Sequence, residues 1–364
     1  MAGKFYLKSF SDINLSDPFF DSLKADYPGS ATSTGFIDWF YKKSAERKKA
    51  LVFEDESGIG AFICLKAESE PLALDTGTLP NISRMKISTI KIAERYRGQR
   101  LGEGALGLSL WKWRDTQFPE IYVTVFDKQD TLIALFEKFG FIHVGNNANG
   151  ERVYLKSRSN IDYSDAYKAF PFINPDFENA GYLIIDQGYH DTMFPYSELH
   201  NTLQESVALN FANGLSKIYV GSAAAPFYKK GDPIFIYRKH TGNGVKRYKS
   251  CLTSYCIVTD VISVKRAGRF NMTLDELLNR IGNKSVYSRQ ELTTKYHSFT
   301  NMTVIEMLYC GYFGAGNNVN MDWLDNNGCW SAPGQYPTSV RLSQDQFKRI
   351  LTEGNVDVDN VIIN

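Results

Sequence analysis

The feature that most restricts the fold of this chain is a strand that leads through a glycine-rich turn into a long apolar helix. In the strand, residues 85–92, apolar side chains occupy positions 85 and 87 and then positions 90 and 92, so the alternation changes phase. A strand that keeps one face buried can do this only with an extra residue, which is a β-bulge. The turn at 97–104 reads Arg-Gly-Gln-Arg-Leu-Gly-Glu-Gly. The order of these elements predicts a sheet strand that is bent shortly before the turn.

A glycine-rich turn between a strand and a helix is suited to binding a phosphate group. Such a turn exposes successive backbone N–H groups, glycines let a ligand approach closely, and the helix adds the positive end of its dipole. The spacing here is G-x-x-x-G-x-G, which is neither the dinucleotide-binding motif nor the P-loop. A tight helix start without a ligand is the alternative interpretation at this point.

The length of 364 residues predicts two domains, at roughly 150 residues per domain. Residues 153–156 are typical of a closing strand, and the polar segment after them indicates a linker. We therefore expect a first domain at 1–157, a linker at 158–169 and a second domain at 170–364. Hydrophobic residues make up 43% of the chain and charged residues 22%, which excludes a disordered or fibrous protein.

The first half of the chain alternates strands and helices. Helical spacing predicts a helix at 36–49, and an apolar stripe from 132 to 139 predicts a second helix that ends at Gly140. The helix that runs to about residue 116 has a broad apolar face, which implies that it packs on a sheet. Strands are expected at 50–54, 59–66, 85–92, 121–125, 141–144 and 151–156.

Two segments of this half resemble motifs of the GNAT N-acetyltransferase superfamily. Residues 99–104, Gln-Arg-Leu-Gly-Glu-Gly, resemble its Q/R-x-x-G-x-G/A pyrophosphate motif. Residues 135–141, Leu-Phe-Glu-Lys-Phe-Gly-Phe, resemble its L-Y-E-K-x-G-F segment, and the order of elements over 1–157 is similar too. The resemblance implies a GNAT fold, a mixed twisted sheet flanked by helices, and therefore an α+β chain.

The resemblance also implies acetyl-CoA as the cofactor. The bulge would part the strands at 85–92 and 120–126, the exposed strand edge would pair with the pantetheine arm, and the turn would hold the pyrophosphate. Two arginines of the turn would add positive charge. The expected cofactor-binding residues are Ile90, Lys91, Ile92, Arg97, Gly98, Gln99, Arg100, Leu101, Gly102, Glu103, Gly104 and Gln129.

The implied chemistry is direct attack of a deprotonated amine on the acetyl carbonyl, which the N–H of Ile92 or a neighbour would polarise. A base and an acid are then needed. The tyrosine that commonly serves as the acid in this superfamily falls at Phe136, which has no proton to give. Tyr122 or Tyr154 could be the acid instead, the thiolate could leave unassisted, or the fold could bind acyl-CoA without transfer. Glu94 is a candidate base, with a surface carboxylate as the alternative.

The second half resembles a different fold. It is predicted to be β-rich, with strands at 232–238, 247–264 and 305–309 and short helices that begin at capping boxes. Residues 229–237, Lys-Lys-Gly-Asp-Pro-Ile-Phe-Ile-Tyr, resemble a strand of PUA-like β-barrels (PUA, ASCH and EVE relatives), and 336–343 are similar to the ending of such domains. The resemblance implies nucleic-acid binding or a pocket for a modified base.

Local charge favours the same function. The whole chain has 41 basic and 40 acidic residues, which excludes a strongly basic protein, but residues 229–249 have seven basic residues against one acid. Aromatic residues interleave with these charges, a combination that suits RNA or single strands. A hairpin with a solvated basic face is the alternative. The expected nucleic-acid-binding residues of this basic stretch are Lys229, Lys230, Arg238, Lys246, Arg247 and Lys249.

Together these patterns predict an acetyl-CoA-dependent N-acetyltransferase with a second module that binds RNA or another nucleic acid. One alternative is a non-catalytic regulator that binds acyl-CoA or nucleic acid, with Phe136 marking lost chemistry. Another is a protein or small-molecule acetyltransferase whose second domain only shapes the acceptor site. No apolar run approaches the ~18 residues of a membrane span. Five irregularly spaced cysteines indicate buried thiols in a cytoplasmic protein and no metal site.

Overall fold

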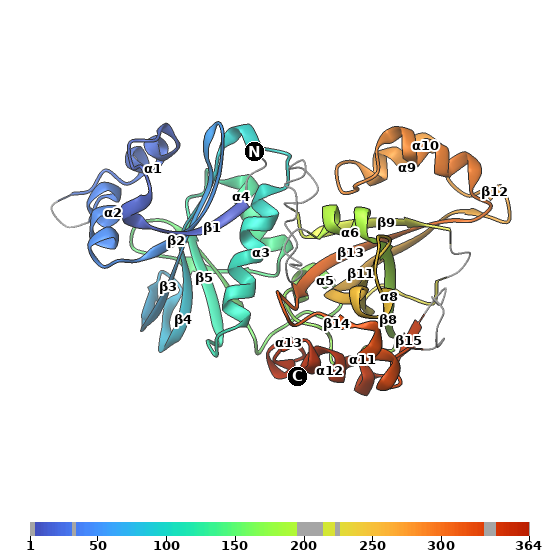
Figure 1. Cartoon of the computed structure of the whole chain (residues 1–364). Helices are drawn as coiled ribbons and strands as arrows, with labels where there is room; N and C mark the ends of the chain where they lie inside the picture. The colour runs from blue at the N-terminus through green and yellow to red at the C-terminus, as the bar shows by residue number, and fades with distance from the viewer. Residues whose placement is uncertain (1–3, 31–33, 195–213, 223–225, 331–339, 364) are drawn as a thin grey trace. The chain divides into compact units, whose positions relative to one another are not determined.

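The computed structural model describes residues 4–30, 34–194, 214–222, 226–330 and 340–363 (Figure 1). The chain folds into two compact units. The first unit comprises residues 1–137 and 141–160, and the second comprises residues 138–140 and 161–364. The segment expected to be a linker, 158–169, contains the short helix α5 (Ala166–Ala169), which belongs to the second unit.

A seven-stranded sheet forms the centre of the first unit. Its order is β1-β2-β3-β4-β5-β7-β6, in which β4 and β5 are parallel and all other neighbours are antiparallel. Parallel neighbours need a crossover connection, and here a helix supplies it. The strands are β1 (Lys4–Ser9), β2 (Lys49–Asp55), β3 (Gly58–Leu74), β4 (Gly77–Ile92), β5 (Glu120–Val125), β6 (Ile142–Asn146) and β7 (Arg152–Ser157).

Helices cover both faces of this sheet (Figure 1). The helices α1 (Asp21–Asp26) and α2 (Phe36–Ala45) lie on one side, where Phe62 of β3 packs edge-on against Phe10 and Phe20. The crossover helix α3 (Leu101–Arg114) lies on the other side, and its Leu106 and Trp113 are fully buried. The broad apolar face predicted for α3 is therefore confirmed. The helix α4 (Asp130–Lys138) also belongs to the first unit, except for Lys138 at its end.

The predicted β-bulge is present in β4. Thr89 lies opposite Cys64 of β3, and Ile87 lies opposite the next residue, Leu65, so Ser88 is the extra residue. Ile90 then lies opposite Ile63, on the same face as Ile87. The bulge thus keeps the apolar residues of β4 on one face, which is the physical reason for the phase change in the sequence.

Directly after this bulge the two parallel strands part. The pairing of β4 with β5 runs from Arg84 and Glu120 to Ile87 and Val123 and ends there. Beyond that point β4 continues to Ile92 paired with β3, and β5 continues to Val125 paired with β7. The facing edges of the two strands are therefore not joined by ladder hydrogen bonds over their last residues.

An eight-stranded sheet forms the centre of the second unit. Its order is β15-β8-β10-β11-β13-β9, with β12 and β14 also paired to β11, and only β8 and β10 are parallel. The strands are β8 (Ala180–Asp186), β9 (Ser216–Gly221), β10 (Pro233–Lys239), β11 (Cys251–Arg266), β12 (Arg269–Phe270), β13 (Met302–Tyr312), β14 (Val319–Asn320) and β15 (Val340–Leu342). The chain is therefore α+β with a β-rich second unit, as predicted.

Helix starts in the second unit confirm the capping signals in the sequence. Thr273, Ser288 and Ser343 each accept a hydrogen bond from the N–H three residues later, and the side chain of that residue bonds back. In the described part of this unit the helices, besides α5, are α6 (Gln187–Met193), α8 (Lys246–Lys249), α9 (Leu274–Ile281), α10 (Arg289–Ser298), α11 (Met321–Asn326), α12 (Gln344–Glu353) and α13 (Val358–Val361). None of the helices in the described ranges is long and apolar enough to cross a membrane.

Some expected elements have different bounds. The strand expected from residue 247 begins at Cys251, because residues 246–249 form α8. The strands expected at 59–66 and 85–92 extend toward each other into one long hairpin of β3 and β4, whose outer part is polar and so lacks the apolar alternation that marks a strand. Of the ending at 336–343, residues 336–339 lie outside the described residues and 340–342 form β15.

Candidate functional site

The glycine-rich turn connects β4 to α3 through two residues with left-handed backbone conformations. Gly98 has a φ of 73° and Arg100 has a φ of 61°. Glycine adopts this conformation without strain, whereas the Cβ atom of Arg100 makes it costly there. A Cβ atom built on Gly98 would meet no atom within 4 Å, so the space in front of this residue is open. An open turn at a helix start is the arrangement that phosphate binding requires.

The first turn of α3 lies beside the end of β4. A Cβ atom built on Gly102 would be 3.8 Å from Cγ1 of Ile92 and 3.6 Å from Cδ2 of Leu135 on α4. Residues 90–92, the glycine turn and the start of α3 therefore meet at one place. Leu101, Glu103 and Gly104 of the predicted set are buried in the helix, and Gln99 bonds through Nε2 to the backbone oxygen of Arg95 at 2.9 Å.

The charged residues of the turn are already paired. Arg100 and Glu103 form an ion pair of 2.8 Å, and their side chains are only 11% and 9% exposed. Arg97 and Glu94 form a second pair of 2.8 Å with side chains that are 77% and 83% exposed. Arg100 thus fixes the start of α3, and Arg97 is the more accessible of the two cations. Glu94, the candidate base, is a surface carboxylate bound to Arg97.

A polar atom without a partner marks the place where the strands part. Oγ of Ser88 is buried and has no hydrogen-bond partner in the described part of the chain. Buried hydroxyl groups usually have one, so a ligand group between the strands would satisfy it. Lys91, in contrast, is turned toward α1: Nζ contacts Oγ of Ser22 and lies 5.0 Å from the ring centre of Phe19. Burial lowers the pKa of Lys91.

Gln129 lies at the start of α4 and is exposed. Its backbone oxygen accepts hydrogen bonds from the N–H groups of Leu132 and Ile133 at 2.9 and 3.0 Å, so the residue closes the first turn of the helix. A contact between its side chain and a cofactor stays a prediction.

Of the two candidate acids, Tyr122 is bound within the sheet. Its ring is buried, and its hydroxyl group donates to Glu68 of β3. Burial raises the pKa of Tyr122, and the nearby Glu68 raises it further. Its ring packs with Val153, Leu155 and the outer part of the β3–β4 hairpin. The Tyr122 proton is therefore held by a carboxylate on the face of the sheet opposite α3.

Tyr154 lies closer to the parted strands. It pairs directly with Val123, the last residue of β5 that is joined to β4. Its hydroxyl group donates to Oε1 of Glu137 at 3.1 Å, and its ring centre is 6.5 Å from that of Phe136. Burial raises the pKa of Tyr154, so its phenol is protonated at neutral pH. Phe136 is fully buried and acts as part of the core.

Sequence reasoning missed a buried carboxylate next to β7. Glu151 is only 5% exposed; its Oε1 accepts a hydrogen bond from the hydroxyl group of Tyr27, and its Oε2 accepts one from Nδ2 of Asn147, both at 2.8 Å. In the sequence Glu151 follows an Asn-rich turn and has the pattern of a solvated residue. No local signal could find it, because Tyr27 is 124 positions away.

The basic stretch of the second unit is largely neutralised by carboxylates from elsewhere in the fold. Arg238 is buried and pairs with Asp191, so it does not present its charge at a surface, contrary to the expectation from sequence. Among the described residues, five carboxylates from outside the stretch contact it, which reduces its local net charge from six to about one. The pairs are Lys229–Glu178, Arg238–Asp191, Lys239–Asp186, and Arg247 with Asp322 and Asp325.

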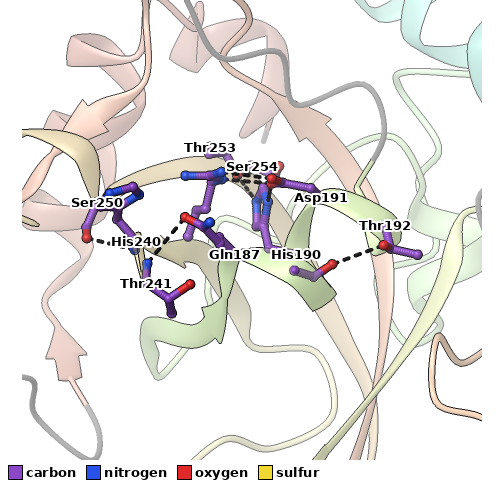
Figure 2. A network of polar contacts seen from close by, with 11 residues as sticks. Gln187, His190, Asp191, Thr192, His240, Thr241, Ser250, Thr253 and Ser254 are labelled. Atoms are coloured by element: carbon purple, nitrogen blue, oxygen red, sulfur yellow. Dashed lines mark hydrogen bonds and ion pairs between the residues drawn. The ribbon is translucent and has the colours of Figure 1, made fainter. Parts of the chain in front are cut away.

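A buried polar network joins His190 and Asp191 of α6 to Thr253 of the sheet (Figure 2). Arg238 belongs to the same network, because it donates hydrogen bonds to Asp191. Nδ1 of His190 lies 2.8 Å from Oδ1 of Asp191, and Nε2 lies 2.7 Å from Oγ1 of Thr253. These distances suit a base between a carboxylate and a nucleophile. His190 and Thr253 are both 0% exposed, however, which indicates a structural role.

The charges in this network follow from burial and pairing. Burial lowers the pKa of His190, so the ring is neutral. Burial alone would raise the pKa of Asp191, but hydrogen bonds from Arg238 and His190 outweigh it and lower the value to about 2. The network is therefore held by one ion pair, Arg238 with Asp191, and by neutral hydrogen bonds.

The described residues contain no cluster of three or more His, Cys, Asp or Glu side chains that could hold a metal ion. All five cysteines are buried and none forms a disulfide bond. The buried, unpaired thiols agree with the prediction from the cysteine spacing, and the absence of a bound metal stays a prediction.

Comparisons with known proteins find likeness only among solved structures. No protein-family model matches the chain, and no curated protein matches it. A GNAT-family acetyltransferase from Streptococcus agalactiae is similar over 43% of this chain and 95% of that one, with 14% identity and a TM-score of 0.34. A putative phosphinothricin N-acetyltransferase is similar over 44% of this chain and 100% of that one, with 19% identity and a TM-score of 0.33.

A second group of similar structures consists of ASCH proteins. The ASCH protein from Zymomonas mobilis is similar over 48% of this chain and 94% of that one, with 10% identity and a TM-score of 0.32. The solved structures that are similar to this chain thus include both kinds of fold that the sequence resembles, each over less than half of its length. The first unit has the mixed sheet, the bulge and the parted strands that the resemblance to GNAT proteins implies, and the second unit is the β-rich one.

Proposed function

We propose that the first unit transfers an acetyl group from acetyl-CoA to an amine. The observation that carries this proposal is the parting of β4 and β5 at the Ser88 bulge, directly before the open glycine turn and the start of α3. The unjoined edge of β4 offers amide groups to an extended amide-bearing chain, as a sheet edge does to an added strand. The turn and the helix start offer N–H groups and a positive dipole end to phosphates.

The residues at this place fit the chemistry of acyl transfer. Acetyl-CoA supplies an activated acyl group as a thioester. The backbone N–H groups of residues 90–92 can polarise its carbonyl oxygen, and the Ser88 hydroxyl group provides one more buried donor. Tyr154 is the acid that we favour over Tyr122, because it lies beside Phe136 and next to the point where the strands part. Free thiol release from acetyl-CoA in the presence of amines tests the proposal.

We also propose that the second unit binds a single-stranded nucleic acid through residues 245–249. The observation that favours this is the exposure of Val245, directly before Lys246, and of Tyr248, directly before Lys249; each is 61% exposed. Aromatic faces stack on bases and lysines contact phosphates.

We expect the double variant K246E/K249E to weaken binding of a labelled oligo(U) RNA about tenfold and to lower the salt slope by about two, because two phosphate contacts are lost. Fluorescence anisotropy over a salt series measures this. The charge-matched control K42E/K112E, in the first unit, keeps the affinity of the wild type. RNA binding that is independent of salt or equal in both variants contradicts the proposal.

A further inference from the structure

The Tyr27–Glu151 pair lies beside the opening between the parted strands. The segment from Ser22 to Tyr27 contacts both strand ends: Ser22 contacts Lys91 of β4, and the ring of Tyr27 lies 5.5 Å from the ring of Phe126, which directly follows β5. This segment therefore spans the gap on the α1 side of the sheet. Glu151 adjoins the same place, because the next residue, Arg152, pairs with the last residue of β5.

Glu151 differs from the other carboxylates around it. Asp26 pairs with Lys128 at 2.5 Å, and Asp127 pairs with Arg152 at 2.5 Å. Within the described part of the chain Glu151 has neutral donors only, although it is the most buried of the three. A buried carboxylate is normally stabilised by a positive charge, so this site lacks a cation.

We propose that the Tyr27–Glu151 pair is the proton acceptor for the ammonium group of the acyl acceptor. This inference rests on the proposed function and names the acceptor class: primary or secondary amines that are protonated at neutral pH. Tyr27 is 36% exposed and Glu151 is 5% exposed, so Tyr27 is the more accessible member of the pair, and its hydroxyl oxygen is the atom to which we assign contact with the ammonium group. Glu151 acts through Tyr27.

The proton transfers balance. The ammonium group R–NH₃⁺ gives one proton to the Tyr27 oxygen as the Tyr27 proton passes to Glu151, which leaves a neutral amine and a neutral carboxylic acid. The amine nitrogen then forms a bond to the acyl carbon, and the carbon–sulfur bond breaks. The second proton leaves the nitrogen and reaches the departing sulfur, which yields a thiol. Glu151 returns its proton to water.

The test uses the full chain, acetyl-CoA, and three acceptors: spermidine, a lysine-containing peptide, and hydroxylamine, which is largely neutral at pH 7. We expect E151Q and Y27F to lower kcat/KM for the two protonated acceptors about a hundredfold at pH 7, because a general base contributes on the order of 10²–10⁴. The loss shrinks as the pH rises toward 10, since the free amine then forms without a base. With hydroxylamine both variants stay within about threefold of the wild type.

Controls distinguish the loss of the proton acceptor from a folding defect and from a failure of the proposed acetyl transfer. D127N removes a neighbouring exposed carboxylate and keeps the wild-type profile, and the melting-temperature rise with coenzyme A shows that each variant folds. We expect the affinity of the coenzyme A complex for spermidine, measured by calorimetric titration, to be about tenfold weaker in E151Q than in the wild type. Variants that keep the wild-type pH profile, or that lose rate equally with hydroxylamine, overturn the inference. The wild type could also bind spermidine through Glu151 and release no thiol. That result overturns both acetyl transfer and the proton-acceptor role, and it identifies Glu151 as part of a binding site for ammonium groups.

Discussion

A buried hydroxyl group without a hydrogen-bond partner costs free energy of folding. Among the residues that the structure describes, none provides a partner for the hydroxyl group of Ser88 at the bulge of β4. We expect Ser88→Ala to raise the free energy of unfolding by about 1 kcal/mol, because the unsatisfied group is removed. The same change should weaken coenzyme A binding several-fold, because a donor or acceptor between the parted strands is lost. Denaturant unfolding and calorimetry measure the two effects.

Ser109 offers a matched control for Ser88. It is fully buried in α3, but its Oγ donates to the backbone oxygen of Ala105 at 3.0 Å. Ser109→Ala is expected to leave coenzyme A affinity unchanged and not to stabilise the protein. Equal effects of the two substitutions would mean that the Ser88 hydroxyl group has no ligand.

Which of these residues can be predicted from sequence depends on how local their partners are. Gly98 and Arg100 belong to a turn whose glycine spacing can be recognised in the sequence, and both residues have a left-handed backbone conformation in the structure. Glu151 and Tyr27 are far apart in sequence, and Arg238 meets Asp191 47 positions away. Arg238 was therefore expected on a surface, although it is part of the core.

At the scale of elements, the helix α6 depends on the Arg238–Asp191 pair. The pKa of Asp191 is lowered to about 2 in the folded protein. The charged carboxylate therefore stabilises the fold fully at pH values above the ordinary aspartate pKa of about 4. That stability is lost as the pH falls from about 5 to about 2. We expect Asp191→Asn to lower the free energy of unfolding by about 2 kcal/mol at pH 7, with the difference from the wild type vanishing toward pH 2.

Denaturant unfolding at several pH values, followed by tryptophan fluorescence, measures the role of this pair. Asp186→Asn is the matched control, because Asp186 directly precedes α6 and pairs with Lys239 through a side chain that is 52% exposed. That substitution should cost well under 1 kcal/mol, as for surface pairs in general. A difference between Asp191→Asn and the wild type that is the same at pH 3 and pH 7 would contradict the ion-pair account.

The elements that build the candidate site could be predicted, because each leaves a periodic signal. The phase change in residues 85–92 predicts the bulge, and the apolar stripes predict α3 and α4. The long outer part of the β3–β4 hairpin could not be predicted, because its polar residues are held by pairing rather than by a buried face. The helix α8 was missed since it has only four residues.

At the scale of the whole molecule, the net charge of the chain does not predict where charge is exposed on its surface. The chain is nearly neutral, and the basic stretch at 229–249 suggested a local exception. The fold brings carboxylates to that stretch from four other segments, so the exception nearly disappears. The α+β first half and the β-rich second half could be predicted from motifs and periodicity, whereas this compensation depends on tertiary contacts. The remaining exposed lysines and Tyr248 define a smaller candidate surface than the sequence did.

The central claim is that the open turn before α3 holds a phosphate-bearing acyl donor for transfer. The most direct test is the rate of free thiol release from acetyl-CoA by the full chain with an amine panel, compared between G98D and G98N. Both side chains tolerate a left-handed backbone and have nearly the same size, but only Asp adds a negative charge in the turn. We predict thiol release by the wild type, and a KM for acetyl-CoA at least tenfold higher in G98D than in G98N. No thiol release with any amine, or equal KM values in the two variants, would contradict the account.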